Sequence, residues 1–366
     1  MGRIDIVEPT LSSEAGHCHS FVESVCSARR VGEDGITVYA GSRALLPRIR
    51  ALGVRVVPYF HRRIRRPEAF LLYRKLLREP GRIFIPTAGR ADLVMLSLAA
   101  GRTIPPAKAF LYFHWVKPDP SKRKFFRYAC RRQPDLTLMG PTESVAEILR
   151  ESGFRDVRVV PYPRFSDPAE SPGVEAAFRH VLYAGAARRD KGFPAVVDFV
   201  RFAADAGAAI PMTVQASPEH YGKLDEGIPE EVDRLRKSSA PRLTILPETL
   251  DAAEYRALFA GAIVLQPYLL HDFADRISGV TLDAFSAGAP VVATAGTWMA
   301  RMADRFGAGV ALRDPSPASI LSAVEAVRAE YPRFHRNALA AGSVLRKEHG
   351  ARHLLEILLS ADGRTP

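Results

Sequence analysis

Long apolar runs and cysteines are scarce in this 366-residue chain. No apolar run reaches the roughly 18 residues that a membrane-spanning helix needs, and the first six residues, which include an arginine and an aspartate, predict a strand rather than a signal peptide. The three cysteines, Cys18, Cys26 and Cys130, contain no Cys-x-x-Cys pair. An odd number of cysteines in a chain of this length favours reduced thiols, and we therefore expect a cytoplasmic protein.

Several common catalytic motifs are also missing. The sequence has no His-x-x-x-His pair on a predicted helix and no cysteine pair of the kind that holds zinc, so we expect no metal site. It has no Gly-x-x-x-x-Gly-Lys-Ser/Thr loop, which disfavours a P-loop nucleotidase. It also lacks the Gly-x-Ser-x-Gly elbow that carries a serine nucleophile.

Positive charge is plentiful but unevenly placed. The chain has 51 Lys and Arg against 40 Asp and Glu, a formal net charge of +11. Residues 1–164 hold 29 basic and 15 acidic residues, whereas the remainder holds 22 and 25. The positive excess therefore belongs to the first half, and we expect that half to meet an anionic partner: anionic lipid, an acidic glycan or nucleic acid.

Strand-like and helix-like segments alternate along the chain, which predicts an α/β protein with two doubly wound domains, each a parallel sheet with helices on both faces. Four prolines in residues 161–173 mark the break between the domains. We predict a first domain over residues 1–165, a linker over 166–178, a second domain over 179–335, and C-terminal helices over 336–366 that cross back to the first domain. The predicted strands occupy residues 4–8, 36–40, 54–58, 82–86, 109–114, 136–139, 157–161, 180–185, 210–216, 243–246, 262–266, 291–294 and 309–312. Because such sheets bind ligands at the carboxyl ends of their strands, we expect a site in a cleft between the domains.

The most informative segment holds two acids, Asp275 and Asp283, on either side of a glycine-containing turn. A helix, a Gly-x-Pro-Val-Val stop and a buried strand follow. A helix that starts near Gly279 would aim the backbone N–H groups of Ser278, Gly279 and Val280, together with its dipole, at an anion. This favours a phosphate on the helix start and a diol held by Asp283. A loop acid and a helix-start acid with purely structural roles are the alternative interpretation.

A second segment, residues 180–193, places two cations after a strand. The apolar strand ends in a small-residue turn, and Arg188 and Lys191 stand in the loop before the next helix. Such a pair can clamp two phosphates, arginine through its forked guanidinium and lysine as a point charge. Taken alone, the pair also suits a solvated basic loop; the acidic pair downstream favours the phosphate interpretation.

The order of these two segments resembles the donor half of the retaining glycosyltransferases of the GT-B fold, the group 1 or family 4 type. The resemblance implies two Rossmann-like domains that face a central cleft, and a nucleotide-diphosphate sugar as co-substrate without cofactor or metal. It also implies roles for individual residues: Arg188 and Lys191 bind the diphosphate, Gly279 approaches it through its backbone, Asp283 holds the ribose hydroxyls, and Asp275 contacts hydroxyls of the donor sugar. Aspartate stands where the family has glutamate at both acidic positions.

The first half offers further candidates at strand ends. The family has a glycine-containing loop after its first strand, where Gly16 and His17 stand in this sequence. By the same resemblance His114, at the end of a predicted strand, faces the donor sugar, where an imidazole can hydrogen-bond a hydroxyl or balance developing charge. A histidine satisfied at a strand end is an equally good interpretation.

Two basic segments, residues 61–78 and 122–132, mix arginine and lysine with large apolar residues at helical spacing. This pattern suits helices on an anionic membrane surface and hence a peripheral position on the inner face of the membrane. Ordinary amphipathic helices with a basic solvated face explain it as well. Nucleic acid is the least favoured partner because no recognised binding module accompanies the charge.

We therefore expect a glycosyltransferase that moves a sugar from a nucleotide-diphosphate sugar to a glycan, a lipid-linked glycan or a glycoprotein. The resemblance implies that the transfer proceeds with retention and that it serves cell-surface polysaccharide synthesis. Arg188 and Lys191, with His114, would act through orientation and stabilisation of the departing diphosphate. Two rivals stay open: a nucleotide-sugar epimerase of the same fold, which needs no acceptor, and a non-catalytic scaffold that kept the fold.

Overall fold

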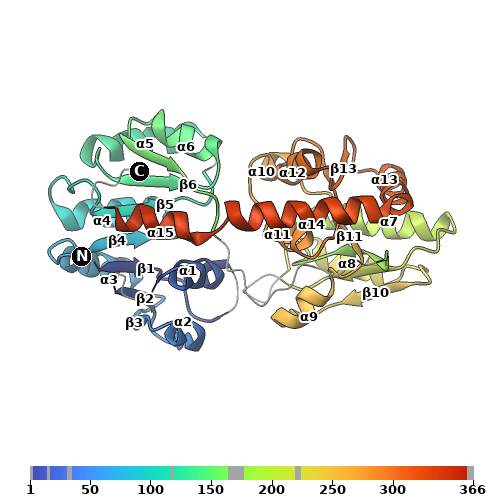
Figure 1. The fold of residues 1–366 in the computed structure, drawn as a ribbon, viewed down its shortest axis with the longest axis horizontal. Coiled ribbons are helices and arrows are strands. Elements are labelled where there is room, and N and C mark those ends of the chain that lie inside the picture. Colours follow the sequence, from blue (N-terminus) through green and yellow to red (C-terminus); the bar gives the residue numbers. More distant parts are fainter. Residues whose placement is uncertain are drawn as a thin grey trace. The chain divides into compact units, whose positions relative to one another are not determined.

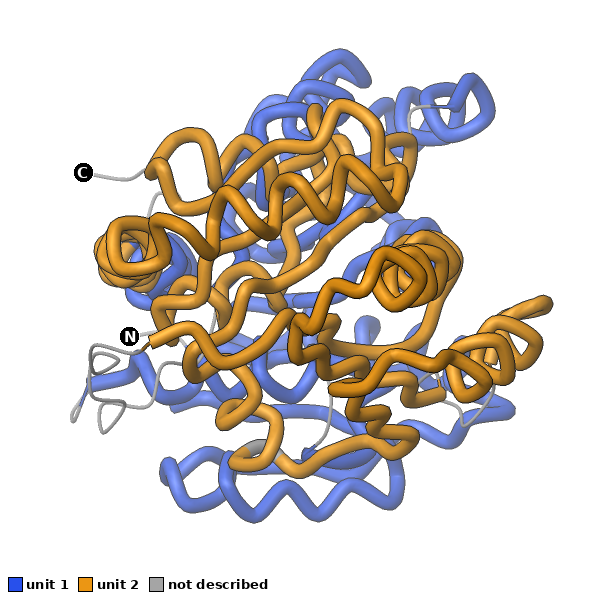
Figure 2. Tube along the Cα trace, turned by 90° about the vertical axis from the view of Figure 1, so that its right-hand side faces the viewer, with its two compact units in different colours: residues 1–167, 348–366 blue, residues 168–347 orange. Residues whose placement is uncertain are grey.

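The chain folds into two compact units. The computed structural model describes residues 3–14, 17–30, 35–116, 119–163, 177–218 and 224–360. Unit 1 comprises residues 1–167 and 348–366, and unit 2 comprises residues 168–347 (Figure 2). Each unit contains a parallel sheet flanked by helices (Figure 1), which confirms the predicted fold class.

Unit 1 is built on a seven-stranded parallel sheet in the order β3-β2-β1-β4-β5-β6-β7. The strand order reverses between β1 and β4, which makes that position the topological switch point of the sheet. The strands are β1 (Ile4–Val7), β2 (Ile36–Gly41), β3 (Arg55–Phe60), β4 (Arg82–Ile85), β5 (Ala109–Tyr112), β6 (Thr137–Gly140) and β7 (Asp156–Val159). The helices are α1 (His17–Ser27), α2 (Pro47–Ala51), α3 (Arg65–Leu76), α4 (Arg90–Ala100), α5 (Pro120–Arg132), α6 (Glu143–Arg150) and α15 (Ala351–Leu359).

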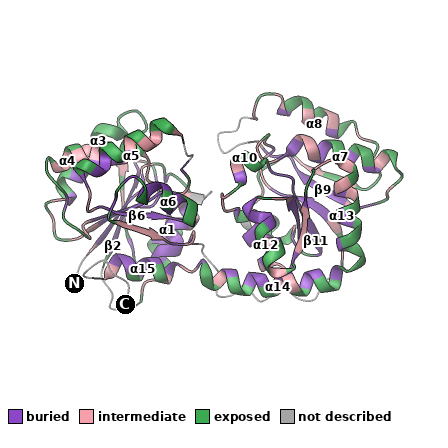
Figure 3. Ribbon diagram, turned by 90° about the horizontal axis from the view of Figure 1, so that it is seen from above, coloured by how far each residue is buried: buried purple, intermediate pink, exposed green. Residues whose placement is uncertain are grey.

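Two apolar cores cover the two faces of this sheet. Helices α1, α2 and α15 pack on one face, and α3, α4, α5 and α6 pack on the other. Successive residues of a strand point to opposite faces, so β4 gives Phe84 to the first core and Ile83 and Ile85 to the second. Most strand residues are buried (purple in Figure 3), as expected for parallel strands covered on both sides.

Unit 2 is built on a six-stranded parallel sheet in the order β10-β9-β8-β11-β12-β13, with its switch point between β8 and β11. The strands are β8 (His180–Tyr183), β9 (Met212–Gln215), β10 (Leu243–Leu246), β11 (Ala262–Gln266), β12 (Val291–Thr294) and β13 (Gly309–Leu312). The helices are α7 (Phe193–Asp205), α8 (Ile228–Arg236), α9 (Ala252–Ala257), α10 (Leu270–Phe273), α11 (Gly279–Ser286), α12 (Trp298–Phe306), α13 (Pro317–Ala329) and α14 (Tyr331–Glu348).

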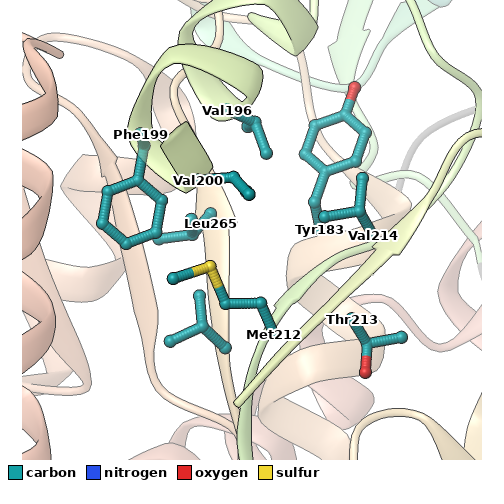
Figure 4. A pocket seen from close by; sticks show the side chains of 9 residues that line it. Tyr183, Val196, Phe199, Val200, Met212, Thr213, Val214 and Leu265 are labelled. Carbon is teal, nitrogen blue, oxygen red and sulfur yellow. The ribbon is translucent and has the colours of Figure 1, made fainter. Parts of the chain in front are cut away.

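The packing of α7 on this sheet shows why a ligand is not expected inside the core. Val196, Phe199 and Val200 of α7 face Tyr183 and Met212 of the neighbouring strands (Figure 4). The space that they enclose with their neighbours holds no water-sized volume. The packing therefore leaves no room for a ligand between α7 and the sheet at this position.

The thirteen predicted strands are all present, and their ends differ from the prediction by at most two residues. The predicted linker, residues 166–178, lies almost wholly outside the described residues. After α14 the chain continues into α15, which packs against α1 in unit 1. No helix in the described part of the chain combines the length and the apolar character needed to cross a membrane.

Candidate functional site

Two loops meet at the switch point of the unit 2 sheet. One loop joins β8 to α7, and the other leads from β11 towards α11. The N–H of Leu269 in the second loop donates to the carbonyl of Asp190 in the first, at 2.9 Å. Gly192 has φ 66° and lies so close to Pro267 that a Cβ atom would be 2.0 Å from the Pro267 carbonyl oxygen. A side chain at position 192 would therefore push the two loops apart.

Two arginines, one from each loop, share the Asp190 carboxylate at this meeting point. Arg188 donates to both oxygens of Asp190, from Nε at 2.9 Å and from Nη2 at 2.6 Å. Arg276, on the other loop, places Nη1 3.7 Å from Oδ2 of Asp190, and its guanidinium lies 4.9 Å from the centroid of the Phe273 ring. Burial lowers the pKa of Arg276, and Arg188 lowers it further. The cluster of Arg188, Lys191 and Arg276 around Asp190 is therefore positive overall, which suits an anionic ligand.

Lys191 has a strongly lowered pKa. Burial, with the nearby charges of Arg188 and Arg276, lowers the pKa of its amine to about 8, and Asp190 opposes the shift. The side chain reaches back over the end of β8, where a Cβ atom on Gly185 would be 3.1 Å from its Nζ. Gly185 also has φ 106°, a conformation that other residues rarely adopt. Glycine at position 185 thus leaves room for the lysine amine.

The start of α11 is organised from β11. The Ser278 hydroxyl caps the helix by accepting from the N–H of Thr281 at 3.4 Å. It also accepts from the Gln266 amide at 3.0 Å, while the Thr281 hydroxyl donates to the Gln266 carbonyl oxygen at 2.7 Å. These buried contacts occupy the Ser278 side chain. The N–H groups of Gly279 and Val280 have no acceptor among the described residues, as expected for the first turn of a helix.

The described residues leave open space beside Gly279. Apart from its own turn of the chain, no atom of the described residues lies within 4 Å of the position that its Cβ would occupy, and its φ is not in the left-handed region. Neither packing nor backbone conformation explains a glycine here. The close approach of a ligand to the helix start would explain the glycine.

The two sequence-predicted acids lie on either side of this helix start, and each has a partner. Asp275 accepts a hydrogen bond from Nη2 of Arg301 at 2.9 Å. Arg301 also donates to the carbonyls of Ala274 and Gly296, so it holds the segment that carries Asp275. Asp283, one turn inside α11, accepts from the hydroxyl of Tyr255 on α9 at 3.4 Å.

One unit 1 candidate, His114, lies at the carboxyl edge of the unit 1 sheet. His114 follows β5, and its Nε2–H donates to the Pro86 carbonyl at 2.7 Å. Its ring packs against Phe21, Tyr112 and Tyr162, with centroid distances of 5.1 to 5.3 Å. The imidazole is thus held in place at a strand end. Gly16 and the side chain of His17 lie outside the described residues.

Glu8, which the sequence did not single out, is buried at the same edge directly after β1. It accepts from the N–H of Thr10 at 3.1 Å, from the Thr10 hydroxyl and from the Thr87 hydroxyl. Burial raises the pKa of Glu8 despite these donors. Glu8 therefore fixes the loops that follow β1 and β4 to each other.

Sequence reasoning also missed three residues of the unit 2 site: Arg276, Asp190 and Tyr255. Arg276 and Asp190 stand next to predicted residues, so a census of charges within the two motifs could have found them. Tyr255 carries no local signal because only the fold brings α9 to Asp283.

Comparisons with known proteins agree on the fold. No protein-family model matches the chain, and no curated protein matches its sequence. Sucrose-phosphate synthase from Thermosynechococcus elongatus matches with a TM-score of 0.71 and 12% identity, over 98% of this chain and 97% of that one. Anabaena HepE in complex with UDP and glucose matches with a TM-score of 0.67 and 13% identity, over 97% and 98% of the two chains. WaaG, a glycosyltransferase involved in lipopolysaccharide biosynthesis, matches with a TM-score of 0.64 and 11% identity, over 98% and 100%. At these identities the likeness shows the fold alone, and the fold is GT-B.

Proposed function

We propose that this protein is a glycosyltransferase that transfers a hexosyl or other glycosyl group from a nucleotide-diphosphate sugar, with retention of configuration. The observation that carries the proposal is the cluster of Arg188, Lys191 and Arg276 around Asp190, on the loops that precede α7 and α11 at one edge of the sheet. A diphosphate is the ligand that such a set of donors suits, because it offers several charged oxygens within a short span.

Each group of the unit 2 site has a distinct proposed role. The guanidinium forks of Arg188 and Arg276 bind phosphate oxygens, and Asp190 keeps both in place until a ligand arrives. Lys191 adds a point charge, and the N–H groups of Gly279 and Val280 add neutral donors. Asp283 holds the ribose hydroxyls beside Tyr255. Asp275, oriented by Arg301, contacts hydroxyls of the donor sugar.

The proposed reaction needs stabilisation of a departing charge more than a separate base. The bond between the anomeric carbon and the diphosphate oxygen breaks, the acceptor oxygen bonds to the same face of the sugar, and the acceptor proton passes to the departing oxygen. Negative charge grows on the diphosphate, where Arg188 and Lys191 stabilise it. We assign His114 to the donor sugar as the unit 1 contribution.

The comparisons support the donor class and suggest an acceptor. HepE has been solved with UDP and glucose and with UDP-glucose, and WaaG acts in lipopolysaccharide biosynthesis. We propose a nucleotide sugar as donor here, and as acceptor a glycan, a lipid-linked glycan or a glycoprotein bound by unit 1, in the synthesis of a surface polysaccharide.

Turnover with and without acceptor tests this function. Purified protein is incubated with UDP-, GDP- and ADP-sugars, first alone and then with pooled glycan and lipid-linked acceptors, and nucleotide diphosphate and sugar products are measured. Release of nucleotide that depends on acceptor supports the transferase. Conversion of the sugar without acceptor supports an epimerase, and no turnover of any donor by folded protein supports a scaffold.

The pKa of Lys191 gives the donor site a pH dependence. The amine has a pKa lowered to about 8, so it is protonated at pH 7 and mostly neutral at pH 9. If binding needs the charged amine, the Kd for the nucleotide diphosphate rises by about tenfold between pH 7 and pH 9, in proportion to the lost protonated fraction. Lys191→Arg, which keeps its charge, should show a much smaller change. Equal pH profiles in calorimetric titrations of the two proteins would exclude this role for Lys191.

A further inference from the structure

The outer surface of the α3, α4 and α5 layer of unit 1 combines exposed aliphatic side chains with unbalanced positive charge. These helices cover one face of the unit 1 sheet, and in Figure 3 they lie next to one another. We call their outward surface the basic-apolar face. It consists of exposed residues at helical spacing: Leu71, Arg74 and Lys75 on α3, Arg90, Val94 and Leu98 on α4, and Lys124, Arg127, Tyr128, Arg131 and Arg132 on α5.

The exposed aliphatic residues of this face lie near the middle of α3 and of α4. Helix α3 connects β3 to β4 and α4 connects β4 to β5, and because all of these strands are parallel the two helices run in the same direction. Leu71 lies in the middle of α3, and Val94 and Leu98 flank the corresponding level of α4, one turn apart. Leu71 and Leu98 are 59% and 57% exposed. The packing of the core beneath does not account for two leucines that are so exposed on adjacent helices.

Most of the positive charge of the face has no acid beside it. Lys75 lies 3.8 Å from Glu79, but the other basic residues of the face form no ion pair with the described residues. The acids of α3 and α4 are turned inward or held by neighbours: Glu68 accepts from the N–H and ring of His61, and Asp92 accepts from Tyr73 and the N–H of Gly89. All of the residues of the basic-apolar face are described, and none of them is acidic. On α5, Arg132 lies 5.3 Å from the centroid of the Tyr128 ring, so an aromatic side chain stands among the cations.

The next helix in the layer marks the end of this surface. The exposed residues of α6 include Glu143 and Glu147, and Glu151 follows the helix. Arg150 pairs with Glu143, and Arg123 of α5 pairs with Glu151. The change from basic to mixed charge between α5 and α6 shows that the basic-apolar face is a bounded surface rather than a general property of unit 1.

We infer that the basic-apolar face docks unit 1 on an anionic lipid surface. Basic side chains attract the lipid headgroups, and Leu71, Val94 and Leu98 enter the boundary between headgroups and acyl chains. Nucleic acid would use the charge but has no use for exposed leucines, because it binds through phosphate contacts and stacking on aromatic rings. This inference does not rest on the proposed transferase activity, so lipid binding and nucleotide binding can succeed or fail separately.

Vesicle sedimentation tests the inference. The full-length protein is mixed with vesicles of phosphatidylcholine alone, or of phosphatidylcholine with phosphatidylglycerol, at low and high salt. We expect it to pellet with the anionic vesicles only, and less at high salt. Arg127→Gln/Arg131→Gln should lower the partition coefficient about 25-fold, which corresponds to about fivefold per basic residue. Leu71→Ser/Leu98→Ser should lower it about tenfold while the charge stays the same.

A matched pair of substitutions on unit 2 serves as the control. Arg201→Gln/Phe202→Ser removes one exposed cation and one exposed apolar side chain from α7, and it should pellet like the wild type. The inference is overturned if the wild type stays in the supernatant with anionic vesicles at low salt, or if the leucine variant pellets unchanged. Binding of an RNA or DNA oligonucleotide without vesicle binding would also overturn it, in favour of nucleic acid.

Discussion

Replacement of Arg188 or Lys191 by alanine is expected to lower kcat for sugar transfer by a factor of about 10² to 10³, the range found when one preorganised donor to a developing anion is removed. Both side chains reach the meeting point of the two loops, where Arg188 is oriented by Asp190 and Lys191 lies over Gly185. The loss should appear mainly in kcat, because negative charge on the diphosphate grows as the glycosidic bond breaks.

Arg189 is the matched control, because it stands between these two residues in sequence but not in space. Its Nε donates to the carbonyl of Glu226 at 2.8 Å, which directs the side chain towards the start of α8. Arg189→Ala should therefore keep kcat within a few-fold of the wild type. Thermal unfolding of all three variants checks that the fold is intact. If Arg189→Ala lost as much activity as the other two variants, the loss would come from the general positive charge of the loop. The specific contacts assigned to Arg188 and Lys191 would then be wrong.

Gly279→Val is expected to weaken binding of the nucleotide diphosphate by about 5- to 150-fold with little effect on stability. The protein leaves open space at this position and the backbone is not left-handed, so the fold should accept the larger side chain with a change in Tm of less than about 2 °C. A phosphate on the N–H groups of the helix start would meet the new methyl groups, and overpacking of this kind costs about 1–3 kcal/mol. Calorimetric titration and thermal unfolding measure the two effects.

Gly35→Val provides the comparison for this substitution. Gly35, directly before β2, also has no atom of a described residue within 4 Å of a Cβ and no left-handed φ, but it lies at the amino end of its sheet. The Gly35→Val protein should bind nucleotide with the affinity of the wild type. A Gly279→Val protein that binds as tightly as the wild type would show that no ligand lies on the start of α11.

The parts of the fold and the site that follow from the sequence are those encoded by neighbouring residues. Buried strands appear as short apolar runs, and all thirteen were predicted to within two residues at each end. The helix start near Gly279 was predicted because a glycine-containing turn and an acid about one turn later lie within one short segment. Whether the candidate residues bind a donor stays a prediction.

The parts that the sequence did not predict depend on contacts between distant segments. Arg276 joins the cation cluster because Leu269 ties its loop to Asp190. Arg301 reaches Asp275 from α12, and Tyr255 reaches Asp283 from α9. Glu8 is polar but buried, and only its donors, Thr10 and Thr87, show why it is tolerated there.

Calorimetric titration of the wild type and Asp283→Ala with UDP, GDP, ADP and their sugars tests the central claim, a nucleotide-diphosphate site on unit 2. We predict that the wild type binds one of these nucleotides, and that the variant binds it about 100-fold more weakly because two hydrogen bonds to a carboxylate are lost. The same nucleotide would identify the donor class. If the folded wild type bound none of them, the donor site and the transferase function built on it would be wrong.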